Sequence, residues 1–232
     1  MSDRFRLGCA VGLAVLAVGT PVALAAYRTT TRANAVAVAT AISLRHSDLP
    51  TLKQQSNPST PQGNSSGAQL TACAGGVPES KAFASTQSPT FVSAGDSITV
   101  SSATEILPSL ALVAEDFAAF ERPRALTCLR SLLGGELRGE FPKTDKVNTT
   151  VARVPSVVSG VGKSFGLRFA IVVHVKQGTT TVAVAVYDDV VGFAYGQAEV
   201  TLNVQRTLAP PSPSLERRLA ALLLKRARTA IG

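Results

Sequence analysis

The second half of the chain alternates between apolar and polar residues, and this pattern constrains the possible fold strongly. Every second residue from position 165 to 175 is large and apolar: Phe165, Leu167, Phe169, Ile171, Val173 and Val175. Residues 179–187 and 194–205 alternate in the same way, and Gln177-Gly178 separates the first two segments as a hairpin turn would. Because successive side chains of a strand point to opposite faces, these segments predict antiparallel strands with one wet face.

Helical spacing dominates elsewhere. A helix is predicted after Pro108, where apolar residues recur three or four positions apart: Leu110, Val113, Phe117 and Phe120. A second helix is predicted from Pro123 to a stop at Gly134-Gly135, and a third over residues 213–230. Helices, then strands, then a helix predict the α+β class: an antiparallel sheet of about four to six strands with helices packed on one face.

The N-terminal segment at residues 7–26 carries no charge and follows Arg4 and Arg6. A basic start, an apolar stretch and the exit Ala23-Leu24-Ala25 are typical of a secretory signal peptide, so we assign residues 1–25 to one. The alternative is an uncleaved segment that anchors the protein in the membrane. Both interpretations place the remaining chain outside the cytoplasm.

The rest of the 232-residue chain suits one domain. Its apolar content of 45% indicates a globular protein rather than a disordered one. We expect a leader at residues 26–38 and a single α+β domain at residues 39–232. Residues 54–69 carry no large apolar side chain and are expected to form a flexible loop.

Three cysteines are present, and Cys9 lies in the N-terminal segment. Cys73 and Cys128 remain, and in an oxidising compartment an even pair indicates a disulfide. It would close a loop of about 55 residues, for which chain entropy predicts about 4 kcal/mol of stabilisation. Two free thiols are the alternative.

Motifs that could carry catalysis lack their usual context. The G-x-S-x-G match at residues 63–67 falls in the expected loop, and the match at residues 162–166 precedes a strand, whereas a nucleophile elbow stands between a strand and a helix. Asp188-Asp189 is expected to lie in a turn and offers too few oxygens for Ca²⁺. We therefore expect no catalytic residues, no metal site and no cofactor.

The polar sides of the predicted strands offer candidates for ligand binding. Four residues stand out: Arg168, His174, Tyr187 and Tyr195. We expect them to line a cleft over the sheet, since binding sites combine aromatic and apolar surface with a few polar groups. Ordinary exposed sheet residues are the alternative.

The net charge of +8 is concentrated near the C-terminus. Residues 206–228 contain only one acidic residue, Glu216, beside six basic ones: Arg206, Arg217, Arg218, Lys225, Arg226 and Arg228. This stretch either contacts anionic lipid headgroups or wall polymers, or forms the solvated outer face of a packed helix. No stacking aromatic residues lie nearby, so we expect no nucleic-acid partner.

The order of these elements resembles the extracytoplasmic sensor domain of actinobacterial receptor serine/threonine kinases and its stand-alone secreted or lipoprotein relatives. The resemblance covers about residues 70–230 and includes the cysteine after a helix (Cys128), the phrase at residues 196–202 and the terminal helix. It implies helices around an antiparallel sheet with a central cleft for a ligand. Members usually carry two disulfides, whereas this chain can form one, and no kinase domain is expected here.

Location and resemblance together predict an exported, non-catalytic ligand-binding or sensor-like domain of the bacterial cell envelope. Its partner would be a small molecule, a lipid or an envelope polymer, with membrane contact through residues 7–26 if they are not cleaved. A membrane-anchored structural or adaptor protein of the envelope is the alternative.

Overall fold

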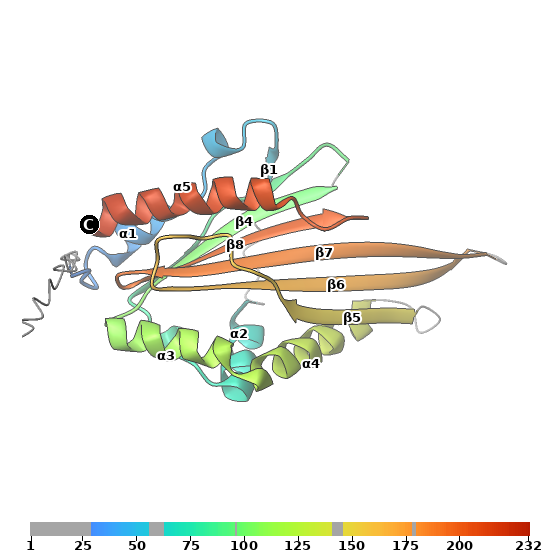
Figure 1. Cartoon of the computed structure of the whole chain (residues 1–232), viewed down its shortest axis with the longest axis horizontal. Coiled ribbons are helices and arrows are strands. Elements are labelled where there is room, and N and C mark those ends of the chain that lie inside the picture. Colours follow the sequence, from blue (N-terminus) through green and yellow to red (C-terminus); the bar gives the residue numbers. More distant parts are fainter. Residues whose placement is uncertain (1–28, 56–62, 96, 141–145, 178–179) are drawn as a thin grey trace, which may run out of the picture.

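An antiparallel sheet runs through the computed structural model, which describes residues 29–55, 63–95, 97–140, 146–177 and 180–232 (Figure 1). The helices are α1 (Ala35–Ile42), α2 (Gly63–Ala74), α3 (Leu110–Glu121), α4 (Pro123–Glu140) and α5 (Pro213–Ile231), with single 3₁₀ turns at His46–Asp48 and Glu79–Lys81. The strands are β1 (Lys53–Gln55), β2 (Ala84–Gln87), β3 (Thr90–Val92), β4 (Ile98–Ile106), β5 (Lys146–Arg153), β6 (Lys163–Gln177), β7 (Thr180–Tyr195) and β8 (Ala198–Thr207).

The described strands join in the order β1-β3-β4-β8-β7-β6-β5, and β2 pairs with β4 beside β3. All pairings are antiparallel, which confirms the α+β class and the hairpin of β6 and β7. The sheet has eight strands instead of the predicted four to six. The strands β1, β2 and β3 have only three or four residues each, which is too short for an alternating pattern to stand out.

Helices lie on both faces of the sheet, and not on one face as predicted (Figure 1). The reason is that the strands bury opposite faces. In β8, Val200 and Leu202 pack in a core with Leu223 of α5. In β6, Phe165 lies on the other face. The register pairs Phe165 with Gly192, and Gly192 in turn with Thr201. Thr201 follows Val200 in β8, so its side chain points to the opposite face. Each face therefore carries apolar surface that helices cover.

The larger core joins the two ends of the described chain. Buried side chains of α1 and α5 pack together against β4, β7 and β8: Ala35, Ala39, Ile42, Leu219, Leu223 and Ile231 from the helices, with Val100, Val191, Phe193, Val200 and Leu202 from the strands. The folded domain thus begins before residue 39, the predicted boundary. Helix α1 extends across this boundary, from Ala35 to Ile42.

Helix boundaries differ from the predictions at two further places. Residues 63–69, predicted as part of a loop, belong to α2, and residues 56–62 lie outside the described residues. α4 begins at Pro123 as predicted but continues past Gly134-Gly135 to Glu140. A glycine costs a helix only about 1 kcal/mol, which the helix formers that follow can overcome.

The predicted disulfide is confirmed: Cys73 of α2 is bonded to Cys128 of α4, with their Cα atoms 5.8 Å apart. The C-terminal helix is also confirmed, with Ser212 as its N-cap and Pro213 in its first turn. Within the described residues, no helix has the length and apolarity that crossing a membrane requires. Residues 7–26 lie outside the described part of the chain.

Candidate ligand-binding site

The four predicted binding residues are spread along the sheet. His174 pairs with Ala183 of β7, whereas Tyr195 is the last residue of that strand. Twelve residues separate Ala183 from Tyr195, which corresponds to about 40 Å of strand. The structure therefore does not bring His174 and Tyr195 together around one small molecule, and their role in binding stays a prediction.

Arg168 is half-buried and is held by an ion pair with a buried carboxylate. Its Nε and Nη2 atoms donate to the two carboxylate oxygens of Asp189, at 2.7 and 2.5 Å. Asp189 is buried within β7, so the predicted turn at Asp188-Asp189 is wrong. The cause is a buried partner: Arg168 lies directly opposite Asp189 in the register, and a charge can enter a strand when it is paired.

Glu216 of α5 lies over this pair. The pKa of Glu216 is raised to about 7, mainly by burial and to a smaller extent by a hydrogen bond with Asp189. Arg168 thus takes part in a polar contact between the sheet and α5. Its guanidinium already has an anionic partner, which leaves it poorly suited to bind a ligand.

A different group of polar residues lies on the opposite face of the sheet, under α3. Glu105 of β4 and Glu199 of β8 are direct cross-strand neighbours. Asp116 of α3 lies above them, and its Oδ1 accepts a hydrogen bond from the Val77 amide at 2.7 Å. The sequence analysis did not select these residues, because only strand register and helix packing bring positions 105, 116 and 199 together.

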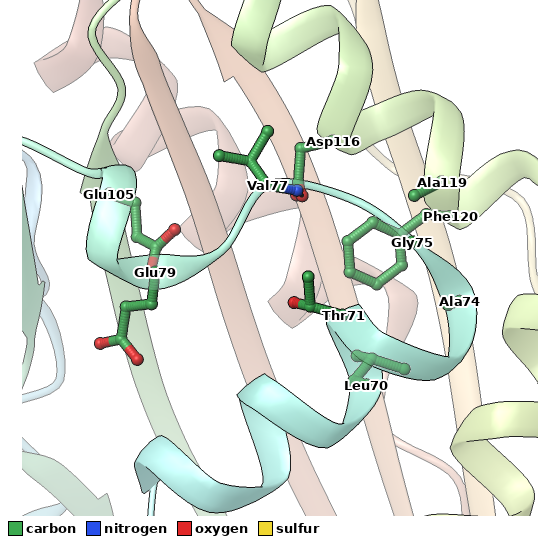
Figure 2. Close-up of a pocket in the computed structure, with 10 residues that line it drawn as sticks. All are labelled: Leu70, Thr71, Ala74, Gly75, Val77, Glu79, Glu105, Asp116, Ala119 and Phe120. Carbon is green, nitrogen blue, oxygen red and sulfur yellow. Dashed lines mark hydrogen bonds between the residues drawn. The ribbon is translucent and has the colours of Figure 1, made fainter.

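Two hollows meet at these carboxyl groups. One, of about 160 Å³, is bounded by Glu105, Asp116, Phe120, the end of α2 and the turn that follows (Figure 2). The other, of about 170 Å³, shares those three residues and continues over the sheet to Glu199 and Thr201. We call the two hollows together the acidic cleft.

Phenylalanine rings form the apolar wall of the acidic cleft. Phe120 of α3 stacks on Phe165 of β6, with ring centroids 4.7 Å apart, and Phe117 lies 5.6 Å from the same ring. Gly192 makes this arrangement possible. A Cβ atom at Gly192 would come within 2.3 Å of the Phe165 ring, so only glycine lets the ring lie flat on β7.

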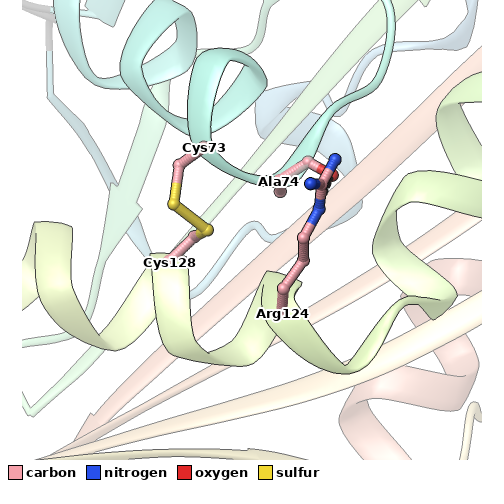
Figure 3. Close-up of a disulfide and its surroundings, with 4 residues drawn as sticks. All are labelled: Cys73, Ala74, Arg124 and Cys128. Atoms are coloured by element: carbon pink, nitrogen blue, oxygen red, sulfur yellow. Dashed lines mark hydrogen bonds between the residues drawn. A yellow bond between two sulfur atoms is a disulfide. The ribbon is translucent and has the colours of Figure 1, made fainter.

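Covalent and polar contacts fix the α2 side of the acidic cleft. The Cys73–Cys128 disulfide joins α2 to α4, and the Arg124 Nε donates to the Ala74 carbonyl at 3.0 Å (Figure 3). Gly75 and Gly76 follow with positive φ angles of 86° and 115°. A Cβ atom at Gly76 would lie 2.7 Å from Asp116 Oδ1, so a larger residue would push against the cleft.

Burial changes the ionisation of the cleft carboxyl groups. It is the main cause that raises the pKa of Glu199 to about 9, and the neighbouring Asp116 carboxylate adds to the effect. Burial and the negative charge of Glu79 raise the pKa of Glu105 to about 7. The pKa of Asp116 is also raised, again mainly by burial. Glu199 is therefore protonated at neutral pH and can donate its proton to Asp116.

The acidic cleft has hydrogen-bonding capacity that the protein does not use. The Oε1 atom of Glu199 is buried and has no hydrogen-bond partner among the described residues. No ion pair within the described part of the chain includes Glu105, Asp116 or Glu199. A buried acceptor without a donor is costly, and a bound molecule with donor groups would remove that cost.

The donor set does not favour a metal. Across the described ranges, no group of three or more histidine, cysteine, aspartate or glutamate side chains is arranged to hold a metal ion. The cleft instead combines carboxyl groups with aromatic rings, which suits an organic ligand.

No protein-family model matches the chain, and no curated protein matches it. Among solved structures, the chain is similar to the crystal structure of the extracellular domain of PknH from Mycobacterium tuberculosis. The identity is 10% and the TM-score is 0.43, over 87% of this chain and 98% of that chain. At this identity and TM-score the likeness concerns the arrangement of elements alone.

Proposed function

We propose that this protein is an exported, non-catalytic domain of the bacterial cell envelope that binds a small ligand in the acidic cleft, as a sensor domain would. The observation that carries the proposal is a hollow with phenylalanine walls, in which a buried Glu199 oxygen has no hydrogen-bond donor in the described part of the chain. Export is supported by the disulfide, since such bonds persist outside the reducing cytoplasm.

The composition of the cleft indicates the chemistry of the ligand. A protonated amine supplies several donors and a positive charge, which matches the carboxyl groups of Glu105, Asp116 and Glu199. A cavity of about 150 Å³ is large enough for benzene, so each hollow accepts a ring or a short aliphatic chain. An amine joined to a small apolar group therefore fits the cleft.

Binding rather than turnover is supported by how the carboxyl groups are engaged. Asp116 accepts hydrogen bonds from the Val77 amide and from Glu199, and Glu105 bonds with Ser85. These contacts hold the acids against the sheet and the turn after α2, and suit them to receive a cation in a fixed position.

The proposal is tested by thermal unfolding of the protein with a set of small amines, such as benzylamine, phenethylamine and agmatine. Ligand binding to the folded state raises its stability, so at least one amine should raise the melting temperature in a saturable way. Benzyl alcohol, which has the same ring without the charge, should not. The Glu199→Gln variant should lose the response, and the matched Glu115→Gln variant should keep it because Glu115 is exposed on the outer side of α3.

A second measurement tests the role of the carboxyl groups directly. Because a bound cation favours the charged form of an acid, amine binding at pH 7 should release protons from Glu105 or Glu199. Calorimetry in two buffers with different ionisation enthalpies measures this number. If no amine in the set stabilises the protein at millimolar concentration, the proposal is wrong.

A further inference from the structure

The outward side of α5 is a continuous basic surface. Arg217, Arg218, Lys225 and Arg228 are all exposed, and we call these four residues the basic face of α5. The opposite side of the helix is buried in the larger core through Leu219, Leu223, Ala227 and other residues. The helix is therefore fixed by its apolar side, and the four cations of the basic face lie on its exposed side.

The protein does not neutralise the basic face. The acidic residue of α5, Glu216, is buried on the inner side of the helix. Within the described residues, no ion pair includes a member of the basic face. Arg228 and Arg217 donate to the carbonyl oxygens of Gly160 and Pro213, which are neutral acceptors. Four positive charges are thus left to an external partner.

One further cation of the helix is already used. Arg226 donates to both carboxylate oxygens of Asp48, each at 2.7 Å, and to the Ser43 carbonyl at 2.9 Å. This contact fixes α5 against the segment that follows α1 and excludes Arg226 from the basic face.

The basic face lies near the place where the described chain begins. The Thr30 amide donates to Oε1 of Gln197, in the turn between β7 and β8. Gly232, the C-cap of α5, lies close to the Tyr195 hydroxyl beside the same turn. Figure 1 shows α1 beside the C-terminal end of α5. The first described residues and the end of the basic face therefore share one end of the molecule.

The apolar segment at residues 7–26 precedes this point by only a few residues. Four residues span at most about 14 Å when extended, so Thr30 would lie within that distance of a membrane that residues 7–26 entered. Electrostatic attraction to an anionic surface extends about 10 Å at 0.1 M salt. The C-terminal part of the basic face would fall near this range.

We propose that, where residues 7–26 are retained as a membrane anchor, the basic face of α5 docks on the anionic phospholipid headgroups of that membrane. The charge of the surface, its lack of an internal acidic partner and its position beside the start of the described chain all support a bilayer as the partner. Docking would orient the domain so that the acidic cleft, on the opposite face of the sheet, points away from the membrane.

Photocrosslinking of the full chain tests this proposal. The chain is synthesised into nanodiscs of phosphatidylcholine with or without 40% phosphatidylglycerol, with benzoylphenylalanine at Ala221, an exposed position between Arg218 and Lys225. The matched control carries the same probe at Ala114, an exposed alanine of α3 on the opposite face. Lipid should be crosslinked from position 221 at least about fivefold more than from position 114, and only in the anionic discs.

Charge and salt provide the second part of the test. Each basic residue near an anionic surface changes partitioning by about fivefold, so the Arg218→Glu/Lys225→Glu variant should lose the crosslink. Raising the salt concentration to 0.5 M should have the same effect on the unchanged chain, which gives a result even if that variant folds poorly. Equal crosslinking from both positions, or in both lipid mixtures, overturns the proposal. Displacement of the crosslink by soluble poly(glycerol phosphate) at equal charge also overturns it, because a wall polymer would then be the preferred partner.

Discussion

Folding and ionisation are coupled at the single residue Glu199. The ordinary pKa of a glutamate, 4.5, rises to about 9 at this position, chiefly because the carboxyl group is buried under α3. The unfolded chain therefore loses this proton at a much lower pH than the folded protein does. Between those two values the folded state binds more protons, so its stability falls as the pH rises.

The Glu199→Gln variant should be less sensitive to pH than the unchanged protein. One such proton contributes a slope of up to about 1.4 kcal/mol per pH unit between pH 4.5 and pH 9, and glutamine removes it while keeping a donor for Asp116. The variant should be more stable than the unchanged protein at pH 8.5, by up to about 5 kcal/mol, because this slope acts over about four pH units. Urea unfolding at pH 5 and pH 8.5 measures this difference.

Other buried acids do not mimic this result. Glu105, whose pKa is raised to about 7, remains in the variant, so part of the pH dependence should persist. The exposed Glu115→Gln variant serves as the control: its charge is only the smallest cause of the raised pKa of Asp116, so this variant should keep the pH dependence that Glu199 produces. An unaltered slope in Glu199→Gln would contradict the burial that the structure gives this carboxyl group.

Two glycine-to-alanine substitutions should have opposite effects. Gly192→Ala should lower the free energy of unfolding by about 1–3 kcal/mol, because the new methyl group overlaps the Phe165 ring, which is stacked on Phe120. Gly134→Ala should raise it by about 0.5–1 kcal/mol, since the added Cβ meets no atom within 4 Å and alanine favours a helix. Thermal unfolding of the two variants checks both signs, and the same sign in both would count against the described packing.

At the scale of elements, α2 is weakly specified by its own sequence and is fixed by cross-links to α4. α2 contains two glycines, two serines, an asparagine and a threonine among its twelve residues, a composition with low helix propensity. The disulfide between Cys73 and Cys128 and the Arg124 contact to Ala74 attach it to α4. This explains why residues 63–69 were predicted as a loop: helix formation there depends on contacts that are distant in the sequence.

Removal of the disulfide should destabilise this side of the acidic cleft. The loop between Cys73 and Cys128 spans 55 residues, so chain entropy predicts a loss of about 4 kcal/mol in the Cys73→Ala/Cys128→Ala variant. For a chain of this size the melting temperature should fall by about 10 °C. Differential scanning calorimetry measures the change, and reduction of the unchanged protein should reproduce it. A loss below about 1 kcal/mol would show that α2 is held mainly by other contacts.

The alternating pattern predicted the positions of the long strands more accurately than the helix signals predicted the helix ends. Alternation located β6, most of β7 and β8 because a strand buries one side chain in two wherever it lies. It did not predict which face of each strand would be covered. The turn at Gly196 sets the register of β8 against β7. Tyr195 pairs with Ala198, so its side chain does not share a face with that of Glu199, as an uninterrupted alternation would predict.

At the scale of the whole molecule, the two ends of the described chain close the larger core. α1 and α5 pack together, and the Arg226–Asp48 ion pair joins residues that are 178 positions apart. The side chains of Arg226 and Asp48 are only 18% and 7% exposed, so loss of one partner leaves a charge with little access to water.

The Arg226→Met variant should therefore lose about 3 kcal/mol of stability, because Asp48 and the Ser43 carbonyl would lose their partner while the apolar stem is kept. Arg218→Met, on the exposed side of the same helix, should change the stability by less than about 0.5 kcal/mol. Urea unfolding of both variants measures the contrast. Equal values for the two would mean that the ion pair does not secure α5 to the segment after α1.

The sequence by itself determined the α+β class and the terminal helix, because periodicity and capping residues act locally. It also determined the pairing of Cys73 with Cys128, because only two cysteines remain after the N-terminal segment. Only the tertiary structure decided that helices cover both faces and that Glu105, Asp116 and Glu199 meet under α3. Strand order and register are fixed by contacts between distant segments, and a carboxyl group shows no sign of burial until those contacts form. Contacts between distant segments also decide which cations are paired: folding pairs Arg168 with Asp189, whereas it leaves the basic face of α5 exposed.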